Sequence, residues 1–211
     1  MSDVTPIRNP SIDSLLTPQN AVLALIDFQP DQYSGVGSVG HDELLSHVTM
    51  LGRVATMFEL PVVLSTVYVK HGMSGTNVEL RDALPGVPEL DRTSMNSWED
   101  PEFVSAVERT GRKKLVIAGL WTEVCVVFPT LDALRAGYQV YVVVDAIGGV
   151  SRVAHESAMQ RMIQAGAIPI SVLALACELQ RDWGRPGAER LRIVMREYFG
   201  KLKALKVQAH A

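Results

Sequence analysis

Cysteine is scarce in this chain of 211 residues, which contains only Cys125 and Cys177. Two cysteines so far apart in the sequence are too few for a disulfide framework or a C-x-x-C metal site. The histidines also lack the H-x-x-x-H and D-x-H spacings of metal centres, so we predict neither a metal nor any other cofactor. The scarcity of cysteine fits a reducing cytoplasm, where we expect the protein.

Long apolar runs and a strong charge of either sign are absent as well. No segment approaches the roughly 18 consecutive apolar residues of a membrane-spanning helix, and the N-terminus does not resemble a signal peptide. The net charge of -3 provides no basic surface for nucleic acid or for an anionic membrane. We therefore expect a small molecule, rather than nucleic acid or a membrane, as the partner.

Five apolar stretches rich in valine, isoleucine and leucine divide the chain. They are nearly continuous rather than alternating, as expected for strands covered on both faces of a parallel sheet. These strands are predicted at 21–27, 61–67, 114–119, 139–145 and 167–174, with a sixth, edge strand near 89–94. Helical patterns lie between them at 42–58, 101–110, 123–136 and 153–165. The alternation predicts a single-domain α/β fold with an open, mostly parallel six-stranded sheet and helices on both faces, in Rossmann-like layers.

The two ends of the chain differ from this pattern. We predict an N-terminal extension at 1–19, the α/β domain at 20–186, and a C-terminal helix with its tail at 187–211. Apolar residues recur at helical spacing in the last segment, at Leu191, Met195, Tyr198 and Leu202. This spacing predicts an amphipathic helix. We favour packing of this helix on its own domain over packing on a neighbouring subunit.

The stretch "GVGSVG" at 35–40 matches the G-x-G-x-x-G pattern of dinucleotide-binding proteins. In those proteins the glycines follow the first strand directly, and an acidic residue ends the second strand. Here "FQPDQYS" intervenes, and the second strand continues into "TVYVK". The context favours a flexible loop at the carboxyl ends of the strands instead.

Asp27 and Cys125 follow the first and third of the five predicted strands. Two such strands commonly lie side by side and flank the crevice in which open α/β sheets bind ligands, so the two side chains could face one another. Each also has a purely structural interpretation. Aspartate often caps a loop or helix, and a buried cysteine often serves as a small apolar core residue.

The chemistry of such a pair is specific. A cysteine in the first turn of a helix lies near unpaired N–H groups and the positive end of the helix dipole, which favour the thiolate. The same donors can hold an oxyanion, while a carboxylate can take the thiol proton and return it to a leaving amine. Thr122 is a plausible N-cap for this helix.

The remaining candidates have weaker support. Cys177 lies among leucines at helical spacing, which favours burial in the core. His71 lies in the loop after the second strand and is the one histidine that could reach the crevice. Arg92 could pair with the aspartate or stabilise a thiolate, but on its own the sequence favours a surface pair with Asp91 or Glu99.

Three stretches, in this order and separation, resemble the isochorismatase-like cysteine hydrolases, and most of all the metal-free YcaC-like branch. They are "LALIDFQ", "DRTSMNSWED" and "KKLVIAGLWTEVCVVFPTLDALRAGYQVYVVVDA". The resemblance implies an isochorismatase-like hydrolase fold and a catalytic triad of Asp27, Arg92 and Cys125. Many members have lysine at the basic position. Arginine keeps its proton near neutral pH, so Arg92 would orient and stabilise charge without shuttling protons.

The resemblance also implies a non-proline cis peptide between Leu120 and Trp121. We expect the backbone N–H groups of Trp121 and Cys125 to hold the oxyanion of a small amide that is hydrolysed through a thioester. The side chains expected to bind substrate are Phe28, Gln29, Asn96, Trp98 and Trp121. The resemblance implies a homo-oligomer, for which an octamer is one candidate. The C-terminal helix is one candidate contact between subunits.

Two alternatives leave the fold unchanged. The chain could be a catalytically silent relative that binds a small molecule or serves as an oligomeric scaffold, because a fold does not by itself determine a function. Cys125 could also act as a thiol redox sensor, which would be oxidised without any hydrolysable substrate.

Overall fold

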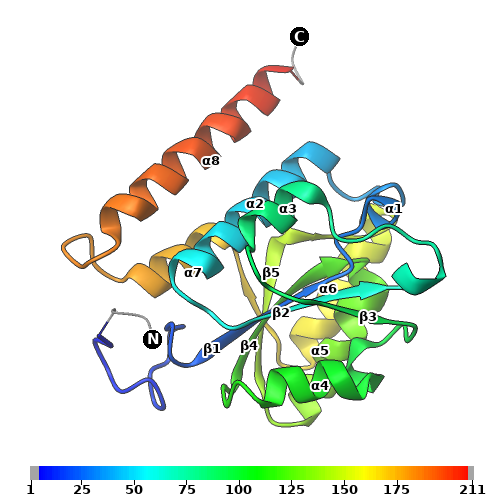
Figure 1. The fold of residues 1–211 in the computed structure, drawn as a ribbon, viewed down its shortest axis with the longest axis horizontal. Helices are drawn as coiled ribbons and strands as arrows, with labels where there is room; N and C mark the ends of the chain where they lie inside the picture. Colours follow the sequence, from blue (N-terminus) through cyan, green and yellow to red (C-terminus); the bar gives the residue numbers. More distant parts are fainter. Residues whose placement is uncertain (1–4, 209–211) are drawn as a thin grey trace.

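The computed structural model describes residues 5–208, and its centre is a parallel sheet of six strands (Figure 1). The outer ends of the predicted extension and tail, 1–4 and 209–211, lie outside the described residues. The strands are β1 Ala21–Ile26, β2 Val62–Val67, β3 Glu89–Arg92, β4 Lys114–Leu120, β5 Gln139–Gly148 and β6 Ile168–Ile170. Their order across the sheet is β3-β2-β1-β4-β5-β6, and every neighbouring pair is parallel. The predicted six-stranded α/β fold is confirmed.

Helices cover both faces of the sheet (Figure 1). One layer contains α2 and α7, with α3 and α8 packed on α2, and the other contains α4, α5 and α6. The helices are α1 Pro30–Tyr33, α2 His41–Met57, α3 Val78–Ala83, α4 Pro101–Glu108, α5 Val127–Arg135, α6 Arg152–Gln164, α7 Val172–Gln180 and α8 Ala188–Gln208. The four predicted internal helices correspond to α2, α4, α5 and α6, whereas α1, α3 and α7 were not predicted.

The last predicted strand is wrong over its second half. The strand β6 ends at Ile170, and the Ser171 side chain then accepts a hydrogen bond from the backbone N–H of Ala174, which starts α7. The Asp145 carboxylate also accepts the N–H of Val172, the first residue of that helix. A side-chain cap therefore ends an apolar run that had been interpreted as continuous strand.

The continuous apolar pattern of the central strands reflects burial on both faces. All six residues of β1 and all seven of β4 are buried. Burial of a leucine or isoleucine side chain stabilises a fold by roughly 1.5–3 kcal/mol, so these strands fix the centre of the core. The strand β1 lies between β2 and β4, with Ile26 paired to both Ser65 and Gly119. The predicted adjacency of the first and third strands is thus confirmed.

Gly119 lets β4 come close to β1 where both strands end. A Cβ atom at this position would lie 2.7 Å from the carbonyl oxygen of Ile26 and 2.9 Å from its Cβ. Real Cβ atoms essentially never lie so close to other atoms, so glycine is the residue that fits. This close approach explains the glycine that interrupts the aliphatic run before Cys125.

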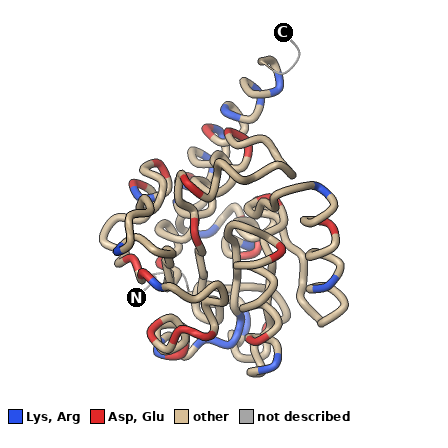
Figure 2. Tube along the Cα trace, turned by 90° about the vertical axis from the view of Figure 1, so that its right-hand side faces the viewer, with Lys and Arg blue, Asp and Glu red and all other residues tan. Residues whose placement is uncertain are grey.

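The C-terminal helix α8 packs on α2 through its apolar side, where Leu191, Val194 and Tyr198 are buried. Lys and Arg residues recur along its length, and residues of both charge signs are spread along the rest of the chain (Figure 2). Docking on its own domain agrees with the expectation, and the helix extends to Gln208. Within residues 5–208, none of the helices combines the length and apolar character required to cross a bilayer.

We expect Gly119→Ala to lower the free energy of unfolding by about 1–3 kcal/mol, because the added methyl group must push β4 away from Ile26. Urea denaturation followed by circular dichroism measures this change. Gly200→Ala in α8 is the control, since nothing lies within 4 Å of a Cβ there and alanine should stabilise the helix by about 0.5–1 kcal/mol. Equal shifts in the two variants would contradict the close approach.

Candidate active site

Asp27 and Arg92 form a buried, bidentate ion pair at the carboxyl ends of β1 and β3. The two terminal nitrogens of Arg92 donate to the two carboxylate oxygens of Asp27, each at 2.8 Å. Asp27 is 0% and Arg92 3% exposed. One Arg92 nitrogen also donates to the backbone oxygen of Thr66 at 3.1 Å, so the guanidinium spans the end of β2. The prediction that Arg92 forms a surface pair with Asp91 or Glu99 is therefore wrong.

The backbone at Asp27 is unusual, because its φ angle is +60°. Aspartate adopts this left-handed region more readily than most residues, and such conformations are frequent at functional sites. The Asp27 N–H still donates to the Ser65 oxygen at 2.9 Å, so the residue remains attached to the sheet. The strand thus ends by turning the carboxylate towards Arg92.

Cys125 lies in a single π-helical turn, Thr122–Val126, between β4 and α5, and is 8% exposed. Its thiol lies beside the Asp27 carboxylate and the backbone N–H of Trp121, and both groups act on its pKa. Asp27, Arg92 and Cys125 therefore form one contiguous cluster, although they come from the ends of three different strands. The sequence-based prediction brought the same three residues together through the family resemblance.

The resting cysteine is a thiol. Burial and the negative charge of Asp27 raise the pKa of Cys125 to about 12, against the opposing effects of Arg92 and the Trp121 N–H. The expectation that a helix start would favour the thiolate is therefore wrong for this resting state. The turn is a π-helix without a side-chain cap, and a carboxylate lies beside the sulfur. Thr122 does not act as the predicted N-cap, since its hydroxyl contacts His155 at 2.9 Å.

Asp27 is suited to accept the thiol proton. Burial raises the pKa of its carboxyl group, while the hydrogen bonds and the positive charge of Arg92 act in the opposite direction. Burial also opposes the charge on Arg92, but the hydrogen bonds and charge of Asp27 outweigh it and raise the pKa of the guanidinium. A carboxylate with a raised pKa is a stronger base, and Arg92 helps to keep it ionised.

Trp121 forms one wall of this region and joins it to the loop after β1. The peptide bond between Leu120 and Trp121 is cis, as the resemblance implied. The indole Nε1 donates to the Gln32 oxygen at 2.9 Å, and a Cβ on Gly35 would lie 2.6 Å from the indole ring. The first glycine of the "GVGSVG" stretch therefore has a packing role against Trp121.

The other predicted substrate-binding residues divide into two groups. Phe28 and Gln29 follow Asp27 directly and are fully buried. The Gln29 amide donates to the oxygens of Val67 and Ser74 and accepts the Val67 N–H. These bonds engage the amide with backbone, so the observed role of Gln29 is to fasten the ends of β1 and β2 together.

Asn96 and Trp98 are not brought to the cluster. Asn96 donates to Asp132 of α5 at 2.7 Å, and Trp98 packs edge-on against Tyr138 with ring centroids 5.4 Å apart. Tyr138 immediately precedes β5, at the amino edge of the parallel sheet, whereas Cys125 follows the carboxyl end of β4. Trp98 therefore packs at the opposite edge from the thiol.

Two further sequence candidates are also placed elsewhere. Cys177 is exposed on α7, so the prediction that it is buried is wrong. His71 stacks on Tyr68, with ring centroids 4.4 Å apart, and is exposed. Within the described part of the chain, no group of three or more His, Cys, Asp or Glu side chains could hold a metal ion.

One contact near the cluster escaped sequence analysis, namely the hydrogen bond between Thr122 and His155. The two residues are 33 positions apart, and no spacing motif links them. Only the packing of α6 against the π-helical turn reveals that they meet.

The cluster combines the groups that acyl transfer requires. It has a thiol as nucleophile, a neighbouring carboxylate as base, a fixed cation, and a backbone N–H directed at the same place. Such a set can open a carbonyl compound through a covalent acyl intermediate.

Comparison with known proteins is consistent with this chemistry. Residues 21–173 match the model of the isochorismatase domain. The probable hydrolase YcaC of Escherichia coli is 40% identical over 170 residues, which cover 80% of this chain and 81% of that protein.

Two solved structures share nearly the whole fold. YcaC from Escherichia coli, described as an octameric hydrolase of unknown specificity, has a TM-score of 0.83 and 34% identity, over 93% of this chain and 98% of that chain. YcaC from Pseudomonas aeruginosa, described with hexane-2,5-diol and covalent acrylamide, has a TM-score of 0.82 and 34% identity, over 92% and 98% of the chains.

We expect alkylation of Cys125 by iodoacetamide to keep accelerating up to about pH 10 without levelling off, because the thiol pKa is about 12. Cys177→Ser supplies the background, since Cys177 is exposed. In this background, Asp27→Asn should label faster at pH 8, because the carboxylate charge is lost while Arg92 remains. A profile that levels off near pH 8.5 and ignores Asp27 would refute the coupling.

Arg92→Met should lower the free energy of unfolding by about 3–5 kcal/mol at pH 7, because it leaves the Asp27 carboxylate buried and unpaired. The loss should shrink towards pH 4. An unpaired buried carboxyl has a higher pKa in the folded state than in the unfolded state. The folded variant therefore binds the proton more tightly, and its free energy of unfolding falls as the pH rises. Asp27→Asn combined with Arg92→Met is the control and should recover part of the loss in urea denaturation. No recovery would contradict a pairing role.

Proposed function

The chain belongs to the isochorismatase domain family of hydrolases, and on this basis we propose that it is a cysteine-dependent amidohydrolase acting on a small amide. Membership confirms the resemblance of the three sequence stretches and their likeness to YcaC. One observation carries the proposal. The Asp27 carboxylate, held by two 2.8 Å bonds from Arg92, lies beside the Cys125 thiol and acts on its pKa.

In the proposed first half-reaction, Asp27 takes the proton of the Cys125 thiol as the sulfur attacks the carbonyl carbon of the amide. The carbonyl oxygen becomes an oxyanion, and the backbone N–H groups of Trp121 and Cys125 hold it. Asp27 then returns the proton to the nitrogen, the C–N bond breaks, and an amine leaves. A thioester on Cys125 remains.

The second half-reaction repeats these roles with water. Asp27 takes a proton from the water molecule that attacks the thioester carbonyl, and the same N–H groups hold the second oxyanion. The C–S bond breaks, the acid leaves, and the sulfur recovers its proton. Because Asp27 moves one proton forward and back in each half, a carboxyl group with a raised pKa suits both directions.

Arg92 acts by charge and geometry in this scheme. Its guanidinium keeps its proton throughout, so it cannot serve as an acid. It holds the Asp27 carboxylate in one orientation through two parallel bonds. While the proton resides on Asp27, the cation also stabilises the developing negative charge on sulfur.

A small and uncharged amide fits the site best. The charges of Asp27 and Arg92 are engaged with each other, while the partly buried Trp121 adds an apolar side chain beside Cys125. The Pseudomonas aeruginosa YcaC structure is described with covalent acrylamide, so a small neutral amide has bonded to that relative. In our proposal the protein works without a metal, in the cytoplasm, as a homo-oligomer such as the octamer described for Escherichia coli YcaC.

Ammonia release from a panel of small neutral primary amides tests the proposal. The wild-type chain should hydrolyse at least one of them, and Cys125→Ser should lower kcat by about 10³-fold or more, because a hydroxyl beside this carboxylate is a far weaker nucleophile. Cys177→Ser is the matched control and should retain full activity, because Cys177 is exposed on α7.

Electrospray mass spectrometry of the wild type mixed with a turned-over amide should show an acyl adduct on Cys125. Absence of ammonia release across the panel, with Cys125 still accessible to alkylation, would favour a small-molecule binder or scaffold. Oxidation of Cys125 without any hydrolysis would favour a redox sensor.

A further inference from the structure

The π-helical turn that carries Cys125 is a single turn, closed by the backbone N–H of Val127 on the Thr122 oxygen. The backbone N–H of Val124 donates to the Trp121 oxygen at 3.0 Å and that of Val126 donates to the same oxygen at 3.3 Å. No side chain caps the turn at its start. Because the Trp121 N–H and the Cys125 sulfur both belong to this segment, contacts from outside the turn also influence their position.

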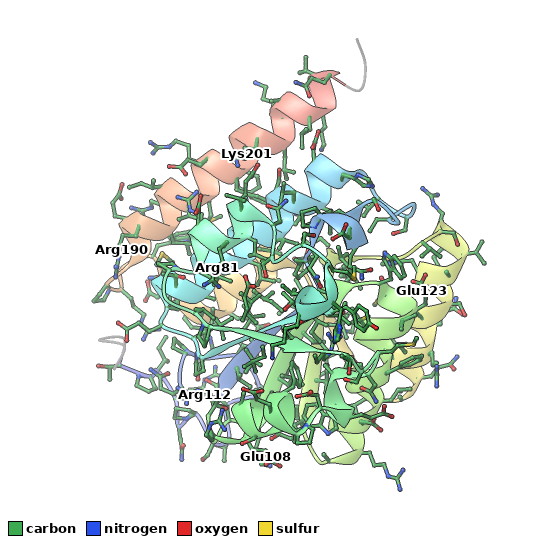
Figure 3. All side chains as sticks on the ribbon, turned by 45° about the vertical axis from the view of Figure 1, so that its right-hand side comes forward. Arg81, Glu108, Arg112, Glu123, Arg190 and Lys201 are labelled. Carbon is green, nitrogen blue, oxygen red and sulfur yellow. The ribbon has the colours of Figure 1, made fainter. Side chains whose placement is uncertain are left out.

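Helix α6 and the loop before it provide that external support. Thr122, which is fully buried, places its hydroxyl oxygen 2.9 Å from Nδ1 of His155 in α6. Glu123, labelled in Figure 3 on the side of the molecule formed by α5 and α6, accepts the backbone N–H of Val150 at 2.9 Å. Two consecutive side chains of the turn therefore bind the segment 150–155.

The packing at this contact is tight. A Cβ on Gly149 would lie 2.5 Å from a carboxylate oxygen of Glu123 and 3.1 Å from the Cβ of His155. The turn and the start of α6 thus approach as closely as their side chains permit. A shift of His155 would therefore change its contact with Thr122 and the packing of Gly149 between His155 and Glu123.

The protonation state and the tautomer of His155 together set the direction of the bond to Thr122. Burial lowers the pKa of His155, while the charges of Glu123 in the turn and Glu156 in α6 oppose this effect. A neutral ring accepts at one nitrogen and donates at the other. With Nδ1 as the acceptor, the Thr122 hydroxyl donates to it, and Nε2 carries the proton.

We propose that His155 is a positioning residue, which acts through Thr122 to hold the Trp121–Cys125 turn against Asp27. It does not touch the sulfur, and its effect on hydrolysis rests on the proposed function. The effect of His155 on the environment of the Cys125 thiol does not depend on the proposed function. Without the bond, the turn relaxes, the thiol moves away from the carboxylate that raises its pKa, and the Trp121 N–H leaves the place of the oxyanion.

Matched variants in the Cys177→Ser background isolate this hydrogen bond. Thr122→Val keeps the shape of the side chain but removes the hydroxyl, whereas Thr122→Ser keeps the hydroxyl. His155→Leu removes the acceptor, whereas His155→Asn keeps a polar group near the place of Nδ1. The inference predicts that Thr122→Val and His155→Leu lower kcat by about ten- to a hundredfold with little change in KM, since small misplacements of catalytic groups are costly.

The conservative variants Thr122→Ser and His155→Asn should stay within about threefold of the background chain in kcat. The double variant Thr122→Val/His155→Leu should lose no more than either single variant, because both remove the same bond. Additive losses, or equal losses in Thr122→Val and Thr122→Ser, would overturn the inference. A lowered melting temperature with unchanged kcat would show a purely structural contact and would overturn it too.

Alkylation of Cys125 by iodoacetamide at pH 7.5 provides a readout that needs no substrate. The Val and Leu variants should be alkylated at least about threefold faster than the background chain, because the thiol pKa falls when Asp27 is farther away. If no amide is hydrolysed yet this acceleration appears, the proposed function fails and the positioning role stands. Unchanged alkylation in both variants would overturn the positioning role whatever the activity.

Discussion

The buried ion pair between Asp27 and Arg92 is the interaction on which the site depends. Removal of two full charges from water costs several kcal/mol for each ion, and only good geometry repays that cost. The two parallel 2.8 Å bonds provide this geometry, and they join the ends of β1 and β3 across β2. The thiol of Cys125 then meets a carboxylate whose orientation is already fixed. In the proposed mechanism this carboxylate is the base that prepares the nucleophile, because the resting sulfur keeps its proton.

The sheet could be predicted because its strands follow a simple physical rule. Strands buried on both faces must be apolar throughout, and β1 and β4 are fully buried. Helix α7 escaped prediction because its residues are nearly as apolar as a strand, so only the capping side chain of Ser171 marks the boundary. Cys177 was misjudged for a related reason, since helical spacing among leucines does not reveal which side of the helix faces the core.

The sequence and its resemblance predicted which three residues form the cluster, but not how Arg92 is paired or whether the Cys125 thiol is protonated. Strand order predicts that Asp27 and Cys125 lie together. The residues alone favoured a surface partner for Arg92, because no sequence pattern marks a pair that spans an intervening strand. The protonation of the thiol depends on burial and on the nearest charge, which only coordinates supply. Trp98 illustrates the same limit, because its nearness to Arg92 in sequence did not place it at the same edge of the sheet.

Asp27 and Arg92 lie directly at the ends of their strands, and Cys125 lies within one turn of its strand. The segments that run on from these points, such as the loop from Ser34 to Gly40, leave the sheet only after the chemical groups have been placed. Exchanges in such loops that spare the contact of Gly35 with Trp121 can therefore change the surroundings of the cluster while Asp27, Arg92 and Cys125 stay where the sheet holds them. This separation gives the fold a means to diversify among substrates over evolutionary time without rebuilding its chemistry.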